Sequence, residues 1–280
     1  MIDNPQIAAK LCTIRQQIRQ RQPLIHCITH PIAMNDCANL VLAAGARPIM
    51  ASHPDEVAEI TASADVLAVN LGNITAVRME AMKRAAAAAC SAGKPILIDL
   101  TGVACSRLRE NFARQFIAAY KPAVIKGNIS EIRLLCGLPA HASGVDAGAE
   151  DHFSAADCSV LETALKTYAS RQTAVVFASG AVDLIADDDR VIYACNGTPR
   201  LTEITGTGCM LGVLAGVYLA AAAPVDAAAL AAMTMGLAGE YAAGCSAGPG
   251  SFHTALFDAM ALLTDADVIA SGRLTEIAPL

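Results

Sequence analysis

The sequence predicts an α/β protein in which helices cover both faces of a mostly parallel sheet. Two observations carry this prediction. Short β-branched runs alternate along the chain with Ala-rich segments of helical length, and several of those segments begin with Ser, Thr, Asn or Asp, the residues that cap helices. Such a βαβα order is typical of parallel sheets, because each crossover between parallel strands needs room for a helix.

The expected strands follow in chain order, each as a short apolar run: LIHCI at 24–28, PIM at 48–50, DVLAVN at 65–70, PILIDL at 95–100, AVIKG at 123–127 and TAVVFAS at 173–179. Helices are expected between them, at 35–44, 54–64, 75–92, 106–120 and 154–171. Together these segments account for the parallel part of the sheet.

The rest of the chain predicts a hairpin and then a helical region. Two apolar runs within 182–197 flank an acidic turn at Asp187–Asp189, which indicates an antiparallel hairpin near the sheet edge. Three long helical segments follow, at 204–222, 225–243 and 251–263. No linker, charge block or repeat divides the chain, so we expect one domain over 1–280, with the small-residue loop at 139–153 as a surface excursion.

The composition restricts the class of function. The 280 residues include 20 Lys and Arg against 26 Asp and Glu, a net charge of −6 that argues against nucleic acid or an anionic membrane as the partner. Ala supplies 58 positions, so most of the excess apolarity comes from small helix formers. Ten cysteines without a CxxC pair indicate reduced thiols in the cytoplasm. The uncharged stretch 204–225 is interpreted as a buried helix rather than a membrane span.

The sharpest local motif is TEITGTGCMLG at 202–212, where a Gly-rich turn enters a long uncharged helix. Free N–H groups and the helix dipole make such a start an anion site. Gly206 and Gly208 let a phosphoryl group approach the backbone, and Thr205 and Thr207 can cap the helix. Cys209 falls in the first turn, where a thiol is acidified. The alternative is a tightly packed helix entry with an inert buried cysteine.

Other motifs are weaker or missing. The spacing GxGxxxG, followed by helix, does not fit a dinucleotide fingerprint. A Walker A loop is absent, because Gly93-Lys94 is followed by Pro95, and there is no GxSxG elbow. His26 and His30 do not lie on a helix, where that spacing would place two imidazoles on one face, so a metal pair is not favoured.

Two acids stand at the ends of expected strands. Asp99 closes PILIDL, and Glu131 lies in KGNISEI just after AVIK. Ligands of open parallel sheets collect at the carboxyl ends of strands. Two carboxylates there suit a largely hydrated Mg²⁺ that bridges nucleotide phosphates. Taken singly, Asp99 is as well explained as a loop cap, and Glu131 as an acid that complements a helix dipole.

In this order the motifs resemble one family, the hydroxyethylthiazole kinases, which salvage thiamine precursors and have a ribokinase-like fold. The resemblance is carried almost throughout the chain by PLIHCITHPIAMNDCANLVLAAGARPIMA (23–51), LAVNLGNI (67–74), VIKGNISEI (124–132), SGVDAG (143–148), ITGTGCMLG (204–212) and GPGSF (248–252). It implies a three-layer α/β/α sandwich. The implied reaction is phosphorylation of the primary alcohol of 4-methyl-5-(2-hydroxyethyl)thiazole by ATP with Mg²⁺.

The resemblance also implies roles for the acceptor side of the site. Met50 and Gly206 would contact the thiazole alcohol, and Asn35 in the segment PIAMNDCANL would bind substrate. Gly206, Thr207 and Gly208 would form the anion hole at the helix start. Cys209 occupies the position where related kinases place an Asp base, and its removal is expected to slow turnover without abolishing it.

For the nucleotide side, the resemblance places Lys126, Asn128 and Ser179 at ATP-binding positions. Asp99 and Glu131 would serve Mg²⁺ and its waters. It further implies a homotrimer with intersubunit sites, in which the segment around 26–50 of one chain faces the 204–209 loop of the next.

Three departures from the family pattern affect substrate detail. DLTG at 99–102 stands where many members have DPVG, THPIAMNDCAN differs in the substrate segment, and Ser179 stands where Thr is common. A kinase of another hydroxyalkyl heterocycle, such as a hydroxymethylpyrimidine or a pyridoxal-like alcohol, and a non-catalytic thiazole binder therefore stay open. An NAD-dependent oxidoreductase is not favoured.

Overall fold

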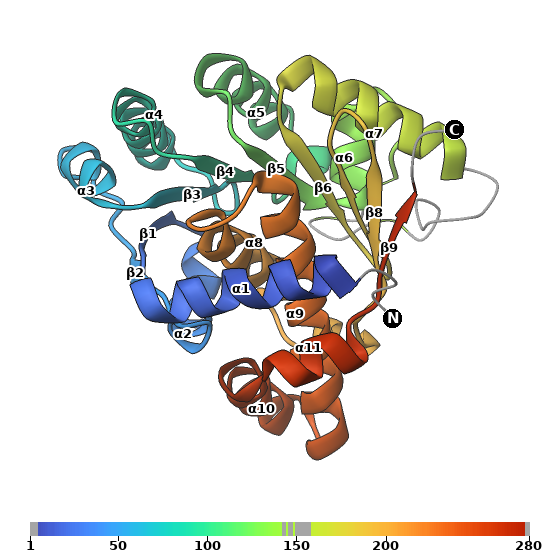
Figure 1. The fold of residues 1–280 in the computed structure, drawn as a ribbon. Helices are drawn as coiled ribbons and strands as arrows, with labels where there is room; N and C mark the ends of the chain where they lie inside the picture. Colours follow the sequence, from blue (N-terminus) through green and yellow to red (C-terminus); the bar gives the residue numbers. More distant parts are fainter. Residues whose placement is uncertain (1–4, 142–143, 145–147, 149–157, 278–280) are drawn as a thin grey trace.

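The computed structural model describes residues 5–141, 144, 148 and 158–277. In this part of the chain nine strands form one sheet, in the order β2-β1-β3-β4-β5-β6-β7-β8-β9, with helices on both faces (Figure 1). The strands are β1 (Leu24–Ile28), β2 (Arg47–Ile49), β3 (Val66–Asn70), β4 (Ile96–Asp99), β5 (Val124–Asn128), β6 (Val175–Ser179), β7 (Asp183–Ala186), β8 (Val191–Ala194) and β9 (Leu274–Ile277). The predicted α/β class is confirmed.

The helices alternate with the strands as the sequence predicts. They are α1 (Pro5–Arg21), α2 (Met34–Ala43), α3 (Val57–Ser63), α4 (Ala76–Ser91), α5 (Arg107–Tyr120), α6 (Ile129–Leu135), α7 (Cys158–Gln172), α8 (Thr207–Leu219), α9 (Pro224–Cys245), α10 (Pro249–Leu262) and α11 (Asp265–Ser271). Short 3₁₀ turns η1 (Pro31–Ala33), η2 (Val103–Cys105) and η4 (Pro199–Glu203) precede α2, α5 and α8.

The sheet is parallel from β2 through β6 and antiparallel from β6 to β9. All carboxyl ends of the parallel strands therefore lie at one edge. The predicted hairpin is β7–β8, but its outer side is covered by β9, which pairs antiparallel with β8. The sequence analysis expected no strand after the hairpin, and that expectation is wrong. LTEI has too few apolar residues to signal a strand before its partner is known.

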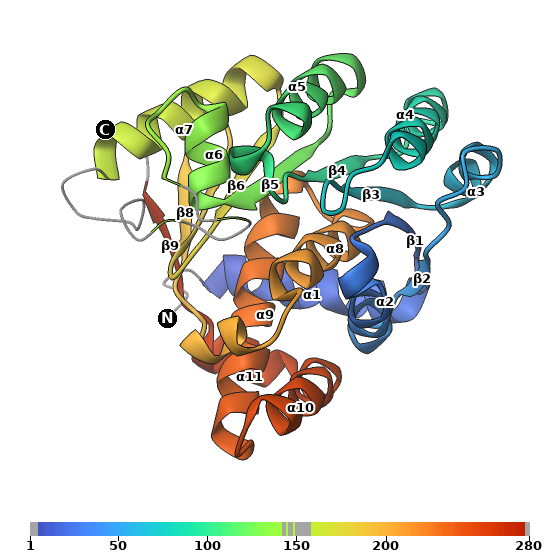
Figure 2. The ribbon, with the colours of Figure 1, turned by 180° about the vertical axis from the view of Figure 1, so that it is seen from behind.

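Side chains alternate between two cores, one on each face of the sheet. In β3, Leu67 and Val69 pack under α4 and α5, while Val66 and Ala68 face α8. This period of two is what a strand buried on both faces requires. Seen from both sides, α1, α2, α8 and α9 form one layer and α4 to α7 the other (Figures 1 and 2).

Two helices, α1 and α11, were not predicted, and α6 was anticipated only as the helix whose dipole Glu131 would complement. In α1 the apolar spacing Leu11, Ile14, Ile18 is present but is interrupted by Arg and Gln, and α1 is held by contacts with α8 and α11. The helix expected at 54–64 is shorter, at 57–63. The helix expected at 154–171 is described from Cys158 onward. Most of the loop 139–153, with the motif SGVDAG, lies outside the described residues.

The long uncharged stretch forms a buried helix. Every residue of α8 from Cys209 to Leu219 is buried against the sheet and α9. Its 13 residues span about 20 Å, short of the ~30 Å of a bilayer core. In the described chain no helix has the length and apolarity needed to cross a membrane.

Candidate active site

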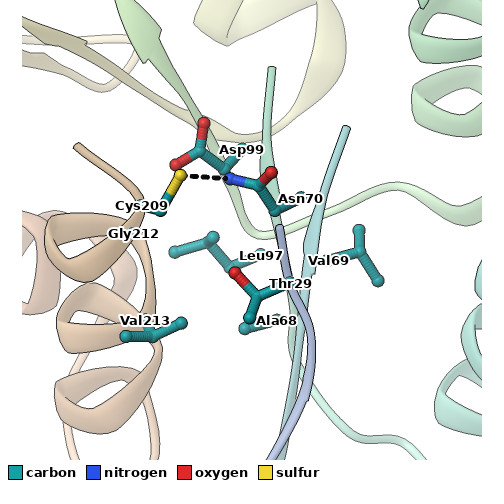
Figure 3. A pocket seen from close by; sticks show the side chains of 9 residues that line it. All are labelled: Thr29, Ala68, Val69, Asn70, Leu97, Asp99, Cys209, Gly212 and Val213. Carbon is teal, nitrogen blue, oxygen red and sulfur yellow. Dashed lines mark hydrogen bonds between the residues drawn. The ribbon is translucent and has the colours of Figure 1, made fainter. Parts of the chain in front are cut away.

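The predicted site residues meet where the carboxyl ends of β3, β4 and β5 face the start of α8. Strand register places Asn70 beside Asp99, and Asp99 beside Lys126. In Figure 3 the side chains of Asn70, Asp99 and Cys209 converge at one end of a small cavity, with a hydrogen bond from Asn70 to Cys209. The cavity holds about 10 Å³, room for one water. A larger substrate therefore cannot lie inside it.

A second cavity is far larger but lacks the predicted chemistry. It holds about 320 Å³ and lies between α9, α10 and α11, lined by Tyr241, Cys245, Ala255, Asp258, Ala259, Leu262, Leu263 and Asp267. None of the predicted site residues contributes to it. Size alone is a poor guide here, and the strand ends are the better candidate because the charged residues gather there.

Asp99 and Lys126 form a buried ion pair. Lys126 Nζ lies 3.1 Å from Asp99 Oδ2 and donates a 2.8 Å hydrogen bond to the Gly208 carbonyl at the start of α8. Burial by itself lowers the pKa of Lys126, but the charge of Asp99, the largest opposing effect, helps to leave the pKa above its ordinary value. Lys126 thus ties β4 to the glycine loop as a charged ammonium.

Glu131 is held by two loops at once. It is the third residue of α6, and its Oε2 accepts a 2.7 Å hydrogen bond from the Asn128 amide in a capping box. Its Oε1 accepts from the Gly102 amide at 2.5 Å. Burial, and then the charge of Asp99, raises the pKa of Glu131 to about 7. The two acids therefore share a region with more negative charge than Lys126 alone neutralises.

The glycine loop packs closely against the segment that precedes α2. Gly206 has φ +86°, and a Cβ there would lie 2.7 Å from the Ala33 Cβ, so only glycine fits. The expectation that a threonine caps α8 is not met. Gly206 is the N-cap residue without a side-chain cap, and the Thr207 hydroxyl instead donates to the Leu201 carbonyl at 3.0 Å. The first amides of α8 are left without a side-chain cap.

Cys209 is buried, and this corrects the predicted acidification. Its Sγ accepts a 3.4 Å hydrogen bond from Asn70 Nδ2 and lies 3.9 Å from the Thr101 hydroxyl. Burial, followed by the charge of Asp99, raises the pKa of Cys209 to about 11, although Lys126 acts in the opposite direction. Desolvation of the thiolate outweighs the opposing effects of Lys126, Thr101 and Asn70, so the resting group is a neutral thiol.

The nucleotide-side residues Asn128 and Ser179 are neighbours. They end β5 and β6 and are paired in register. The Ser179 hydroxyl donates to the Gly127 carbonyl at 3.2 Å, and Asn128 Oδ1 accepts from the Glu131 amide at 2.9 Å. With Lys126 two residues earlier on β5, the three predicted ATP positions share one stretch of the sheet edge.

Met50 and Asn35 lie apart from this group. Met50 follows the edge strand β2, three strand spacings, or about 14 Å, from β4. Asn35 is exposed in the first turn of α2. The segment 26–50 nevertheless reaches the glycine loop of its own chain, because Ala33 contacts Gly206.

Sequence reasoning missed three residues around Cys209. Asn70 closes β3 and donates to Thr101 Oγ1 at 2.9 Å as well as to Cys209. Thr101 in turn donates to Asp99 Oδ1 at 2.9 Å. Arg78, 9% exposed, donates to the carbonyls of Thr29, Asn70, Gly72 and Asn73. Asn70 could have been found, because it is a polar residue at the end of an apolar strand. No sequence signal pointed to Arg78.

The histidine pair does not form a metal site. His26 is fully buried, with its ring nitrogens 2.8 Å from Thr61 Oγ1 and 3.0 Å from the Ala51 carbonyl oxygen. Burial lowers the pKa of His26. Among the described residues no group of three or more His, Cys, Asp or Glu side chains is arranged to hold a metal directly.

Comparison with known proteins gives a consistent result. The family model described as the hydroxyethylthiazole kinase family matches residues 15–266. Hydroxyethylthiazole kinase 2 of Clostridium botulinum (strain Hall) is 42% identical over 261 residues, which cover 93% of this chain and 98% of that protein. The structure of a hydroxyethylthiazole kinase protein from Pyrococcus horikoshii OT3 is similar with a TM-score of 0.86 and 29% identity, covering 96% and 99% of the two chains.

A more distant likeness concerns the fold alone. A ribokinase-like superfamily protein from Enterococcus faecalis V583 is similar with a TM-score of 0.56 and 15% identity, over 85% of this chain and 86% of that one. The arrangement of strands and helices around the described site is therefore the ribokinase-like one.

Proposed function

Because this chain belongs to the hydroxyethylthiazole kinase family, we propose that it transfers the γ-phosphoryl group of ATP to the primary alcohol of 4-methyl-5-(2-hydroxyethyl)thiazole, a step of thiamine salvage. One observation carries the proposal: the uncapped start of α8 at Gly206–Cys209 faces Asp99 and Lys126 at the strand ends. The anion site and the acids thus flank one place, as in-line transfer between a phosphate and an alcohol requires.

Positioning and charge stabilisation account for most of the catalysis. In phosphoryl transfer the negative charge spreads over the equatorial oxygens of a loose transition state. The amides at the start of α8 donate to those oxygens. Lys126 holds this helix start through the Gly208 carbonyl, which keeps the donors fixed while the charge develops.

Cys209 is proposed to orient the alcohol. Its pKa of about 11 keeps the thiol protonated near neutral pH, so it is not a ready base. Sγ accepts a hydrogen bond from the substrate hydroxyl, as it does from Asn70 in the free protein. The alcohol proton departs late, after the phosphorus–oxygen bond has begun to form, and passes to an oxygen of the transferred phosphoryl group, because a loose transition state leaves the attacking oxygen little acidified.

Mg²⁺ is proposed to bind through its waters. The Glu131 oxygens accept from two backbone amides, and those of Asp99 accept from Thr101 and Lys126. These carboxylates suit the hydration shell of the ion better than direct ligation. Burial, and then the charge of Asp99, raises the pKa of Glu131, and a cation beside the two acids would favour its charged form. When bound, Mg²⁺ neutralises charge on the β- and γ-phosphates.

The thiazole is proposed to bind between chains of a homotrimer. Met50 and Asn35 would supply contacts to the site of a neighbouring chain. The place of Met50 beyond the edge strand β2, three strand spacings from β4, supports this. Ile32 and Leu42 on the same segment are 64% and 56% exposed, and an interface would cover such side chains. The ATP-binding role of Lys126, Asn128 and Ser179 belongs to the same proposal.

We further propose a single cytoplasmic domain over 1–280. The continuity of one nine-stranded sheet through the described residues supports one domain. All nine cysteines whose side chains are described are free thiols, which supports a reducing compartment.

The test is ADP release from ATP and Mg²⁺ with hydroxyethylthiazole, with a hydroxymethylpyrimidine, or with no acceptor, and mass analysis of the product. Thiazole-dependent ADP and a gain of one phosphate on the thiazole are expected. Turnover with the pyrimidine alone would reassign the substrate. Thermal stabilisation by thiazole without any turnover would indicate a binder instead of an enzyme.

A further inference from the structure

Lys126, the cation expected to bind the nucleotide phosphates, is already neutralised by an acid of the protein. Lys126 is paired with Asp99 and also donates to the Gly208 carbonyl, and it is buried. Its positive charge therefore offsets an acid of the protein rather than a charge of the ligand. A triphosphate brings several further negative charges to the same edge, and they need a donor that is not yet committed.

Two other basic residues at this edge, Arg78 and His30, are poor candidates to bind phosphate. The guanidinium nitrogens of Arg78 donate to four backbone carbonyls. His30 accepts a 3.1 Å hydrogen bond from the Ile32 amide on Nδ1. Burial lowers the pKa of His30, and the nearby charges of Arg78 and Arg109 add to that effect. His30 is thus a neutral ring at neutral pH, and both terminal nitrogens of Arg78 are engaged by backbone carbonyls.

Arg109 differs from both. It lies in the first turn of α5, half-buried, and its side chain turns back over the loop that follows Asp99. Nη1 donates to the Thr101 carbonyl at 3.2 Å. Within the part of the chain that the structure describes, its side chain makes no other hydrogen bond and no ion pair. The Nε and Nη2 donors of the guanidinium stay available.

The loop is shaped to receive this guanidinium. Gly102 has φ +79°, and a Cβ there would lie 1.7 Å from Arg109 Nη1. The same loop carries both acids: Thr101 donates to Asp99, and the Gly102 amide donates to Glu131. Arg109 therefore binds the same two-residue turn, Thr101–Gly102, that holds both proposed Mg²⁺ carboxylates.

We propose that Arg109 binds phosphate oxygens of the nucleotide through Nε and Nη2. Its positive charge then faces the nucleotide, whereas the charge of Lys126 is neutralised by Asp99. This inference rests on the proposed function for the identity of the nucleotide. A guanidinium anchored by one nitrogen on a backbone carbonyl presents its remaining donors in a fixed plane, the geometry that suits two oxygens of one phosphate.

The test compares Arg109→Gln with Arg107→Gln, a control that removes an exposed arginine from the same helical turn. Calorimetric titration with ATP and with adenosine separates phosphate contacts from base and sugar contacts. Arg109→Gln is expected to weaken ATP binding about 10- to 100-fold, as loss of hydrogen bonds to a charged group does. Adenosine binding should stay within twofold of wild type, and Arg107→Gln should change neither.

Kinetics give a second readout. The KM for ATP should rise with Arg109→Gln while the KM for the acceptor alcohol stays unchanged, and added guanidinium ion should restore part of the lost rate. Arg109→Lys keeps the charge without the planar fork and should lie between wild type and Arg109→Gln. It also serves as the variant to measure if Arg109→Gln does not fold.

The outcomes separate the two proposals. If Arg109→Gln binds ATP as wild type does while thiazole turnover persists, the role of Arg109 is refuted and the proposed function stands. If wild type phosphorylates no alcohol, yet Arg109→Gln loses ATP affinity and keeps adenosine affinity, the phosphate contact stands and the proposed function falls.

Discussion

Lys126 Nζ lies 3.1 Å from Asp99 Oδ2, with the two side chains 4% and 3% exposed. The residues are 27 positions apart and become neighbours because β4 and β5 pair with Asp99 opposite Lys126. Since the same ammonium donates to Gly208, the pair joins the sheet to the start of α8. The electrostatic balance of the site therefore depends on one strand register.

Lys126→Met is expected to destabilise the protein by roughly 3–5 kcal/mol, because it leaves the buried Asp99 carboxylate without a charged partner. Urea unfolding measures this loss. The double variant Asp99→Asn/Lys126→Met removes both charges and should recover a substantial part of it. A single variant that loses under about 1 kcal/mol would show that water reaches the Asp99 carboxylate freely.

Cys209→Ala is expected to lower kcat about 10- to 100-fold without abolishing turnover, because the thiol orients the alcohol and a loose transition state needs little base. Full wild-type kcat under saturating substrates would eliminate a role for this thiol.

Alkylation of the wild-type protein tests the state of the same thiol. With a pKa raised to about 11, Cys209 should react with iodoacetamide near neutral pH far more slowly than the exposed Cys195. Mass spectrometry of the peptides measures both rates. Preferential labelling of Cys209 would indicate a thiolate.

Gly206→Ala and Gly93→Ala form a matched pair. Both glycines have positive φ, so each substitution should cost about 1 kcal/mol through backbone strain. Only at Gly206 would the new methyl meet Ala33, at 2.7 Å, whereas nothing lies within 4 Å at Gly93. Gly206→Ala should therefore lose most activity, while Gly93→Ala keeps it. Equal activity of the two would mean that the loop yields without displacing the helix start.

Asp183 gives a pH dependence of stability. Burial raises its pKa from 3.8 to about 7, although the Gly180 amide and Lys126 oppose the shift. The folded state thus binds a proton more readily than the unfolded state. This contribution to stability is present below about pH 4 and is lost as the pH rises toward 7.

Asp183→Asn removes that dependence. Its unfolding free energy relative to wild type should rise between pH 5 and 7 by about 1 kcal/mol per pH unit. Asp188→Asn, an exposed site in the β7–β8 turn, should show no such trend. A wild-type to Asp183→Asn difference independent of pH would show that Asp183 is ionised throughout.

Much of the fold was predictable because its signals are local. The apolar runs that became β1 to β6, the helix caps at Thr75 and Ser106, and the hairpin around Asp187–Asp189 each lie within a few residues of one another. Two of the elements that were missed, α1 and β9, depend on packing against partners 80 or more positions away in the chain. A local sequence pattern contains no information about such long-range contacts.

The sequence by itself determined which residues could carry the chemistry: Asp99 and Glu131 after apolar strands, and Cys209 behind a glycine turn. Tertiary structure decided how they behave. Register paired Lys126 with Asp99, burial outweighed the opposing effect of Lys126 at Cys209, and the backbone of Gly102 brought Arg109 to the turn that holds both acids. The physical reason is that desolvation and charge pairing depend on neighbours in space, whereas the sequence orders neighbours only along the chain.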